Sequence, residues 1–126
     1  MALDKFGIAK RIAQELKDGM YVNLGMTPTE VLAAWEAGAD AVKVFPCGNV
    51  GGAKYIKALK GPFPQIETIP TGGVSLETIG EFFKAGACAV GVGAELVDTT
   101  LMKQGRFDAI EERARQFLAA ASAARG

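Results

Sequence analysis

The fold is indicated by two nearly identical stretches, AGADAVKV at residues 37–44 and AGACAVGV at residues 85–92. They start 48 residues apart, and six of their eight positions are identical. In each stretch a glycine ends a helical pattern and a short apolar run follows, as expected for a helix that leads into a strand. The same offset aligns Thr27 with Ser75, two candidate helix caps. A period of this length spans two β-α units, so the chain consists of two copies of a β-α-β-α block.

Helix and strand signals alternate along the rest of the chain. Thr27 as a cap, Pro28 in the first turn and Glu30 as the third residue of a capping box predict one helix start. Helices are expected over residues 4–18, 27–38, 52–60, 75–86 and 106–121. Strands are expected over residues 20–24, 41–45, 66–70 and 88–92. Strands that alternate with helices imply right-handed crossovers and a parallel sheet.

These elements predict an α/β fold with four parallel strands alternating with helices, preceded by an N-terminal helix. Two β-α-β-α blocks amount to half of a (β/α)8 barrel. We expect a single half-barrel domain, with a helix–strand opener at 1–25, the βα repeats at 26–98 and a C-terminal helix at 99–126. A flat, doubly wound sheet is the alternative. Half a barrel leaves two open strand edges and a bare inner face, so we expect a homo-oligomer, a dimer or a trimer.

Composition excludes several classes of function. The 126 residues contain no histidine, which excludes a Ser-His-Asp triad and an HExxH zinc site. Fourteen basic and fourteen acidic residues balance, which argues against nucleic acid or an anionic membrane as the partner. No apolar run is long enough for a membrane span, and the two cysteines suggest no disulfide framework. We therefore expect a cytoplasmic protein that acts on a small molecule without a metal or a cofactor.

Lys43 is the most informative residue of the chain. It lies inside an apolar strand, on the face shared by Ala41 and Phe45. Burial disfavours a charged ammonium group, and a neutral amine is a nucleophile toward carbonyl carbons. Lys43 is thus a candidate Schiff-base residue, and the alternative is a lysine on an edge strand that reaches solvent. The repeat places Gly91 at the equivalent position, so the fold does not require a lysine there.

Glycine-rich loops follow two consecutive strands, at residues 71–73 and 91–93. Their backbone N–H groups could bind an anion, as such loops commonly do in barrels. The alternative is that they are tight turns that need glycine for a positive φ. Two further groups have simpler interpretations: Cys47 as a small filler rather than a reactive thiol, and Glu95 as the cap of a helix.

From Gly25 onward the chain resembles the 2-keto-3-deoxy-6-phosphogluconate / 4-hydroxy-2-oxoglutarate aldolases. The resemblance rests on GMTPTE at 25–30, VKVFP at 42–46, KGPFP at 60–64, PTGGV at 70–74 and AVGVG at 89–93. It implies a class I aldolase on a (β/α)8 barrel, usually trimeric, with Lys43 as the Schiff-base lysine. It assigns Phe45, Pro46 and Thr71 to the substrate, with the Phe45 ring on the pyruvyl group. It assigns the phosphate, or distal, end of the substrate to Gly72, Gly73, Gly93 and Ala94.

The resemblance covers only the C-terminal half of such a barrel. The half without a counterpart supplies the family's catalytic glutamate, an arginine for the pyruvate carboxylate and a Gly-Thr loop. Ala94 stands where the family usually has a serine. Residues 1–25 instead resemble the start of a 3-oxoacid CoA-transferase beta subunit, and this second resemblance ends before that family's catalytic glutamate.

Together these observations predict a weak aldolase that releases pyruvate from a 2-oxo acid or a phosphorylated sugar acid. Lys43 would attack the keto carbon, and the general base would be a water, a substrate carboxylate or Glu95. The alternative is a truncated or chimeric half barrel without catalytic activity. CoA-transferase activity is disfavoured.

Overall fold

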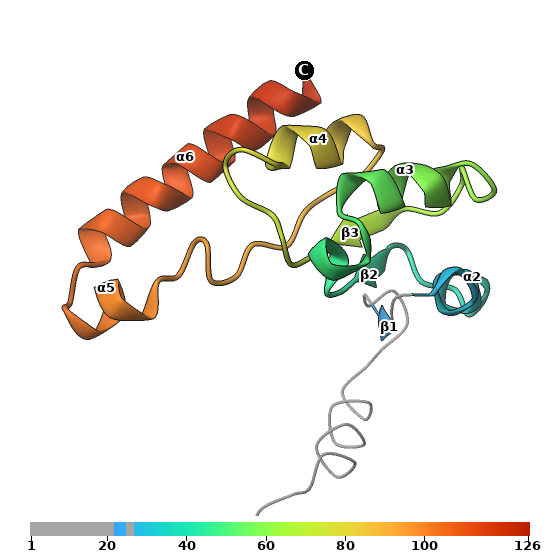
Figure 1. Ribbon diagram of the computed structural model, residues 1–126, viewed down its shortest axis with the longest axis horizontal. Helices are drawn as coiled ribbons and strands as arrows, with labels where there is room; N and C mark the ends of the chain where they lie inside the picture. Colours follow the sequence, from blue (N-terminus) through green and yellow to red (C-terminus); the bar gives the residue numbers. More distant parts are fainter. Residues whose placement is uncertain (1–21, 25–26) are drawn as a thin grey trace, which may run out of the picture.

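The computed structural model describes residues 22–24 and 27–126, and within them three short strands form one parallel sheet. The order is β1 (Val22–Leu24), β2 (Val42–Val44) and β3 (Thr68–Pro70), with β2 in the centre (Figure 1). Lys43 of β2 is in register with Asn23 and Ile69. The prediction of an α/β fold with a parallel sheet is confirmed. The helix predicted over residues 4–18 lies outside the described residues.

The helices follow the strands as the repeat predicts, and the first described one begins where the capping box was expected. Glu30 N–H donates to Thr27 Oγ1 at 3.3 Å, and Thr27 N–H donates to Glu30 Oε2 at 2.9 Å. These reciprocal bonds satisfy two backbone groups at the start of the helix. The helical elements are α2 (Pro28–Glu36), a short 3-10 helix (Cys47–Val50), α3 (Ala53–Lys60), α4 (Ile79–Lys84), α5 (Thr99–Lys103) and α6 (Phe107–Arg125).

Helix α4 begins later than the sequence predicts, because its first turn is held by side chains. Ser75 N–H donates to Thr78 Oγ1 at 2.8 Å, and Thr78 N–H donates to Ser75 Oγ at 3.3 Å. The N-cap of α4 is Thr78, so the prediction that Ser75 caps this helix is wrong, although Ser75 Oγ accepts a bond from the Thr78 amide. Side-chain bonds of this kind compete with helical ones, so the regular helix starts at Ile79.

The prediction of a fourth strand at residues 88–92 is wrong for the described structure. This segment follows β3 through a bridge between Thr71 and Gly91. Its amides at Cys88 and Gly91 donate to the Thr68 and Pro70 carbonyls at 3.1 and 2.9 Å. A parallel ladder would next need an N–H from Pro70 to return a bond, and proline has none. The ladder is therefore interrupted at Pro70 and the segment is not a regular strand.

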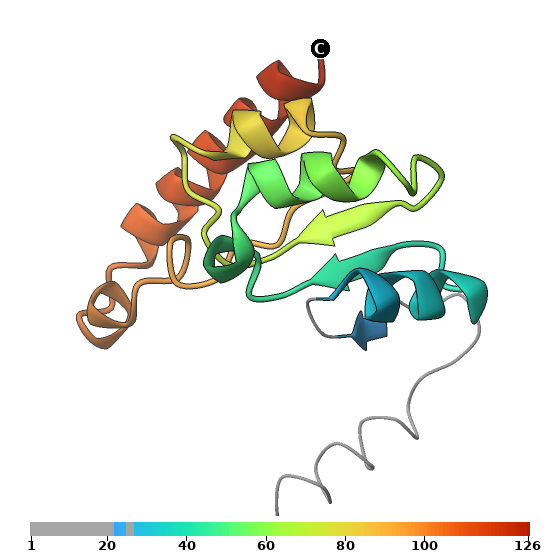
Figure 2. The same ribbon diagram turned by 45° about the vertical axis from the view of Figure 1, so that its right-hand side comes forward.

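The core lies on one face of the sheet. Val42 and Val44 of β2 are fully buried there, together with side chains from the described helices. In Figures 1 and 2, α4 lies between α3 and α6, so these three helices lie side by side. The described helices contribute buried residues to the core: Val31 and Ala34 (α2), Ile56 and Leu59 (α3), Ile79 and Phe82 (α4), and Phe117 (α6).

The opposite face of the sheet carries Lys43, Ile69 and Phe45. Lys43 and Ile69 are half-buried, and the Phe45 side chain is 46% exposed. Side chains alternate between the two faces of a strand, so this is the face away from Val42 and Val44. The described helices therefore leave this face of the sheet open.

Thr68 is the buried polar residue of the described core, and its hydroxyl has no hydrogen-bond partner. We expect Thr68→Val to increase the free energy of unfolding by about 1 kcal/mol, because valine keeps the shape and removes an unsatisfied buried group. Urea unfolding followed by circular dichroism measures the change. Thr29→Val, at an exposed site in α2, is the control and should change the free energy of unfolding little. A loss of stability in Thr68→Val would contradict this account.

Candidate functional site

The loops that follow β2 and β3 are joined by backbone hydrogen bonds. Thr71 N–H donates to Val44 O at 2.9 Å, and Cys47 N–H donates to Thr71 O at 2.8 Å. Gly48 N–H then donates to Gly72 O at 2.9 Å. The pairing of the two strands thus continues past their ends, and the two loops form one rigid rim beside the open face of the sheet.

Glycine is required in this rim for two physical reasons. Gly72 and Gly73 have φ values of +85° and +78°, which side chains rarely adopt. A Cβ on Gly73 would lie 2.8 Å from the Cα of Gly48, which is closer than two carbon atoms can approach. The tight-turn interpretation of this loop is therefore confirmed, and it leaves room for anion binding as well.

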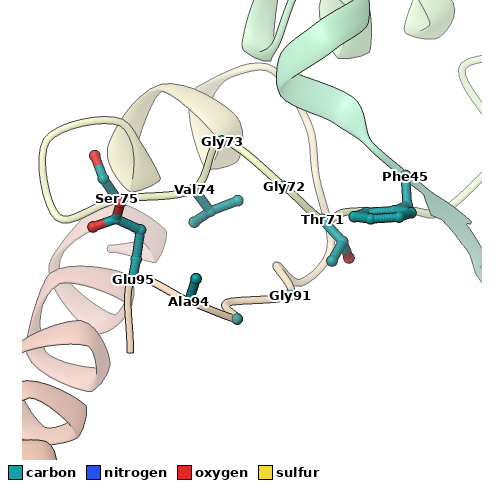
Figure 3. Close-up of a pocket in the computed structure, with 10 residues that line it drawn as sticks. Phe45, Thr71, Gly72, Gly73, Val74, Ser75, Gly91, Ala94 and Glu95 are labelled. Atoms are coloured by element: carbon teal, nitrogen blue, oxygen red, sulfur yellow. The ribbon is translucent and has the colours of Figure 1, made fainter. Parts of the chain in front are cut away.

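A pocket of about 410 Å³ lies at this rim (Figure 3). It gathers most of the predicted substrate and phosphate residues in one place and adds four others, of which Gly91 belongs to the predicted anion-binding loop and Glu95 was a candidate general base. The predicted members are Phe45, Thr71, Gly72, Gly73, Gly93 and Ala94, and the added ones are Val74, Ser75, Gly91 and Glu95. Gly91 lacks a side chain because Thr71 fills that space: a Cβ there would lie 2.3 Å from Thr71 Oγ1. In the sequence, the signal that could have pointed to Gly91 as a pocket residue was its alignment with Lys43 in the repeat.

Lys43 lies next to the pocket and does not line it. Its Nζ is 5.5 Å from the centre of the Phe45 ring, and that ring is part of the pocket wall. β2 is the central described strand, so the interpretation of Lys43 as an edge-strand residue is wrong. No carboxylate of the described residues forms an ion pair with Lys43. Pro46 also lies outside the pocket lining, with its Cα 3.4 Å from where a Cβ of Gly72 would be.

Glu95 does not cap a helix, contrary to the prediction. It lies in a turn in which the Leu96 and Val97 amides both donate to Gly93 O at 2.9 Å. The cap is Asp98, whose carboxylate accepts bonds from the first amides of α5, and these bonds lower the pKa of Asp98. Glu95 instead lines the pocket and accepts a bond from Arg113 Nη2 of α6 at 3.5 Å. This turn separates Glu95 from the start of α5. The residue that caps α5 is therefore Asp98, three residues after Glu95.

The two cysteines are unsuited to nucleophilic chemistry. Cys47 is fully buried, and burial raises the pKa of its thiol from 9.0 to about 11. Its Sγ donates to Gly52 O at 3.7 Å. Burial, followed by the charge of Glu67, also raises the pKa of the Cys88 thiol. Both groups stay protonated at neutral pH, which confirms the interpretation of Cys47 as a filler.

Backbone donors are available around the pocket. Within the described part of the chain, the N–H groups of Gly73, Val74, Gly93 and Ala94 donate no hydrogen bond. Val74 is buried and Gly73, Gly93 and Ala94 are exposed, so these four N–H groups are free to donate to a ligand that enters the pocket. Across residues 22–24 and 27–126, no group of acidic, cysteine or histidine side chains could hold a metal ion, and no helix there could span a membrane.

Comparisons with known proteins place these features in one family. The family model described as "KDPG and KHG aldolase" matches residues 6–113. A 2-dehydro-3-deoxy-phosphogluconate aldolase from Haemophilus influenzae is 34% identical over 91 residues, which are 72% of this chain and 43% of that protein. A 2-dehydro-3-deoxy-6-phosphogalactonate aldolase from Escherichia coli is 42% identical over 71 residues, which are 56% of this chain and 34% of that protein.

Solved structures agree with this assignment. A native KDPGal structure superposes with a TM-score of 0.68 at 34% identity, covering 83% of this chain and 50% of that one. A cube-shaped protein cage designed by fusing symmetric oligomeric domains superposes with a TM-score of 0.66 at 32% identity, covering 80% of this chain and 36% of that one. The chain thus spans less than half the length of the two curated relatives.

The family match extends into the segment that resembles a CoA-transferase subunit. It begins at residue 6, and most of that segment lies outside the described residues. The second resemblance stays a prediction. Because the family model covers most of the sequence, with a parallel sheet and a glycine-lined pocket to match, this chain belongs to the KDPG and KHG aldolase family.

Proposed function

We propose that this chain carries the Schiff-base lysine of a class I aldolase that releases pyruvate from a 2-oxo acid. The Lys43 amine adds to the keto carbon, and loss of water gives a protonated imine. The imine accepts the electron pair of the breaking C–C bond while a base takes the proton of the neighbouring hydroxyl group. The aldehyde fragment leaves, the resulting enamine is protonated on carbon, and hydrolysis releases pyruvate and the free amine.

The observation that carries this proposal is the position of Lys43. It lies on the central strand and on the open face of the sheet, with its Nζ over the Phe45 ring that lines the pocket. An imine on Lys43 would lie against this ring, with Pro46 and Thr71 near the pyruvyl group. The rest of the substrate would extend into the pocket, toward the predicted phosphate or distal-end residues Gly72, Gly73, Gly93 and Ala94.

Borohydride reduction in the presence of pyruvate tests the proposal directly. Reduction converts a transient imine into a stable secondary amine, so a peptide that contains Lys43 should gain the mass of a reduced pyruvyl group. Digestion and mass spectrometry locate the modified residue. An unmodified protein, or modification spread over the surface lysines, would contradict the proposed chemistry.

The general base is the part that the described residues do not supply. No described carboxylate pairs with Lys43, and Glu95 is engaged with Arg113. A general base contributes about 10²–10⁴-fold to a rate, so the chain acting by itself should be a weak catalyst. The same observation favours a second candidate, a half barrel that folds without catalysing a reaction. Turnover that depends on Lys43 separates the two.

We further propose that the half-barrel domain over 1–126 associates with a second copy through the open face that carries Lys43 and Phe45. Phe45 is 46% exposed there, and exposed apolar surface next to open strand edges favours association. Light scattering coupled to size-exclusion chromatography should report a dimer or a trimer, and Phe45→Glu should shift it toward the monomer. Leu118→Glu, at a position of α6 that is 71% exposed, is the control. A monomer at micromolar concentration would contradict the proposal.

A further inference from the structure

The pocket next to Phe45 contains one charged side chain, and that side chain is a carboxylate. Glu95 lines the pocket, and none of the other residues that line it is a lysine or an arginine. A phosphate group carries a charge of about −1.5 to −2 at neutral pH. A phosphate in this pocket would therefore face a carboxylate of the same charge sign, and no basic side chain is among the lining residues.

Glu95 is held in this place by the backbone and by α6. The turn closed by the Leu96 and Val97 amides on Gly93 O fixes the position of its Cα. The Arg113 contact at 3.5 Å engages one carboxylate oxygen, Oε2. Figure 3 shows Glu95 on the side of the pocket away from Phe45. Because Lys43 lies over the Phe45 ring, Glu95 is at the distal end, where the substrate atoms farthest from the imine would lie.

Arg113 contacts Glu95 without lining the pocket itself, and its charge also acts on two further carboxylates. A hydrogen bond from Ser75 lowers the pKa of Glu77, and the charge of Arg113 lowers it further. Backbone bonds at the start of α5 lower the pKa of Asp98, and Arg113 adds to this effect as well. Glu95 is in contact with Arg113 at 3.5 Å, so this guanidinium group is already engaged by the carboxylate that lines the pocket.

A hydroxyl group fits these surroundings better than a phosphate does. It can donate to the Glu95 carboxylate, and hydrogen bonds to an ionised group are about twice as strong as neutral ones. The same hydroxyl oxygen can accept from the backbone N–H groups of Gly73, Val74, Gly93 or Ala94, which donate no bond within the described residues. One hydroxyl group can therefore pair both with the carboxylate and with the backbone N–H groups that line the pocket.

We propose that Glu95 makes the distal end of this pocket select an uncharged, hydroxyl-bearing substrate terminus over a phosphorylated one. This specificity rests on the proposed function, in which Lys43 binds the 2-oxo end of the same molecule. It departs from the relatives named above, whose names specify phosphorylated sugar acids. Glu95 is thus a specificity-determining residue, and the reaction at Lys43 does not require it.

A pair of ligands that differ only in the phosphate tests the proposal. The probes are 2-dehydro-3-deoxygluconate and its 6-phosphate, trapped on the protein with borohydride over a range of concentrations at low ionic strength. For each acid, the concentration that modifies half of the wild-type chain is measured. This concentration should be at least tenfold higher for the phosphorylated acid than for the other acid. Glu95→Gln should reduce this ratio at least fivefold. Glu111→Gln, on α6 and paired with Arg115, is the matched control and should leave the ratio unchanged.

Equal trapping of both acids by the wild-type chain, a preference for the phosphorylated acid, or an unchanged ratio in Glu95→Gln would overturn the proposal. Pyruvate, which has no distal end, is trapped in parallel, and its failure to react would count against the proposed function alone. In that case the pocket is tested without Lys43 chemistry, by titrating glycerol and glycerol 3-phosphate against the amide signals of Gly73 and Gly93. Stronger shifts with glycerol support the inference, and stronger shifts with glycerol 3-phosphate in both the wild type and Glu95→Gln overturn it.

Discussion

Lys43→Met is expected to abolish the pyruvate adduct and any Lys43-dependent cleavage of 2-oxo acids. Methionine is close to lysine in length, and it removes the amine, which lies 5.5 Å from the centre of the Phe45 ring and would form the imine. The lost interaction between the ammonium group and the ring is worth about 0.5–1 kcal/mol, so the variant should remain folded. Activity should fall to background because the nucleophile itself is absent.

The matched control for this variant is Lys57→Met on the exposed surface of α3. It makes the same chemical change away from the pocket and should keep both the adduct and the rate. Intact-mass spectrometry after borohydride reduction gives the extent of modification, and a pyruvate-release assay gives the rate. An adduct of equal yield in Lys43→Met would show that another amine reacts, and the proposed role of Lys43 would be lost.

Gly73→Ala is expected to have the largest effect on stability among the single-methyl additions in the rim. The added Cβ would lie 2.8 Å from the Cα of Gly48, and the backbone at Gly73 has a φ of +78°. The conformational cost for an L-residue is about 1–2 kcal/mol, and separation of the two loops adds to it. We expect a loss of about 2–3 kcal/mol in the free energy of unfolding, together with weaker ligand binding at the pocket.

Gly80→Ala is the matched control, because it adds the same methyl group within α4. A Cβ at Gly80 meets no atom within 4 Å, and alanine favours a helix over glycine by about 0.5–1 kcal/mol. Urea unfolding should therefore show opposite signs for the two variants. Equal stability of Gly73→Ala and the wild type would mean that the loops after β2 and β3 separate without cost.

Local signals predicted the helices well, because each depends on neighbours in the sequence. The Thr27–Glu30 capping box spans four residues, and the structure forms it as expected. The repeat predicted strands at β2 and β3, and the sequence predicted a glycine turn after β3, where Gly72 and Gly73 have positive φ values. Local signals failed at the start of α4, where Ser75 and Thr78 hold the first turn through their own side chains. They also failed at α5, which was not predicted as a separate helix and is capped by Asp98 instead of Glu95.

The fourth strand and the charge of the pocket could not be predicted in the same way. Whether residues 88–92 form a regular strand depends on the strand beside them, and Pro70 has no amide to donate to them. The contact that holds the Glu95 side chain comes from Arg113, which is 18 residues further along the chain. Only the packing of α6 beside the turn at Gly93 brings these two side chains together.

The sequence by itself determined the family, the parallel α/β order and the types of residue at the strand ends, because these follow from short patterns that a chain carries wherever it packs. The tertiary structure decided that Lys43 lies on the central described strand near Phe45, that the loops of Gly48 and Gly73 meet, and that Glu95 lines the pocket. Each of these is a contact between segments distant in sequence. The physical reason is that such contacts depend on which faces pack together, and no single segment specifies that alone.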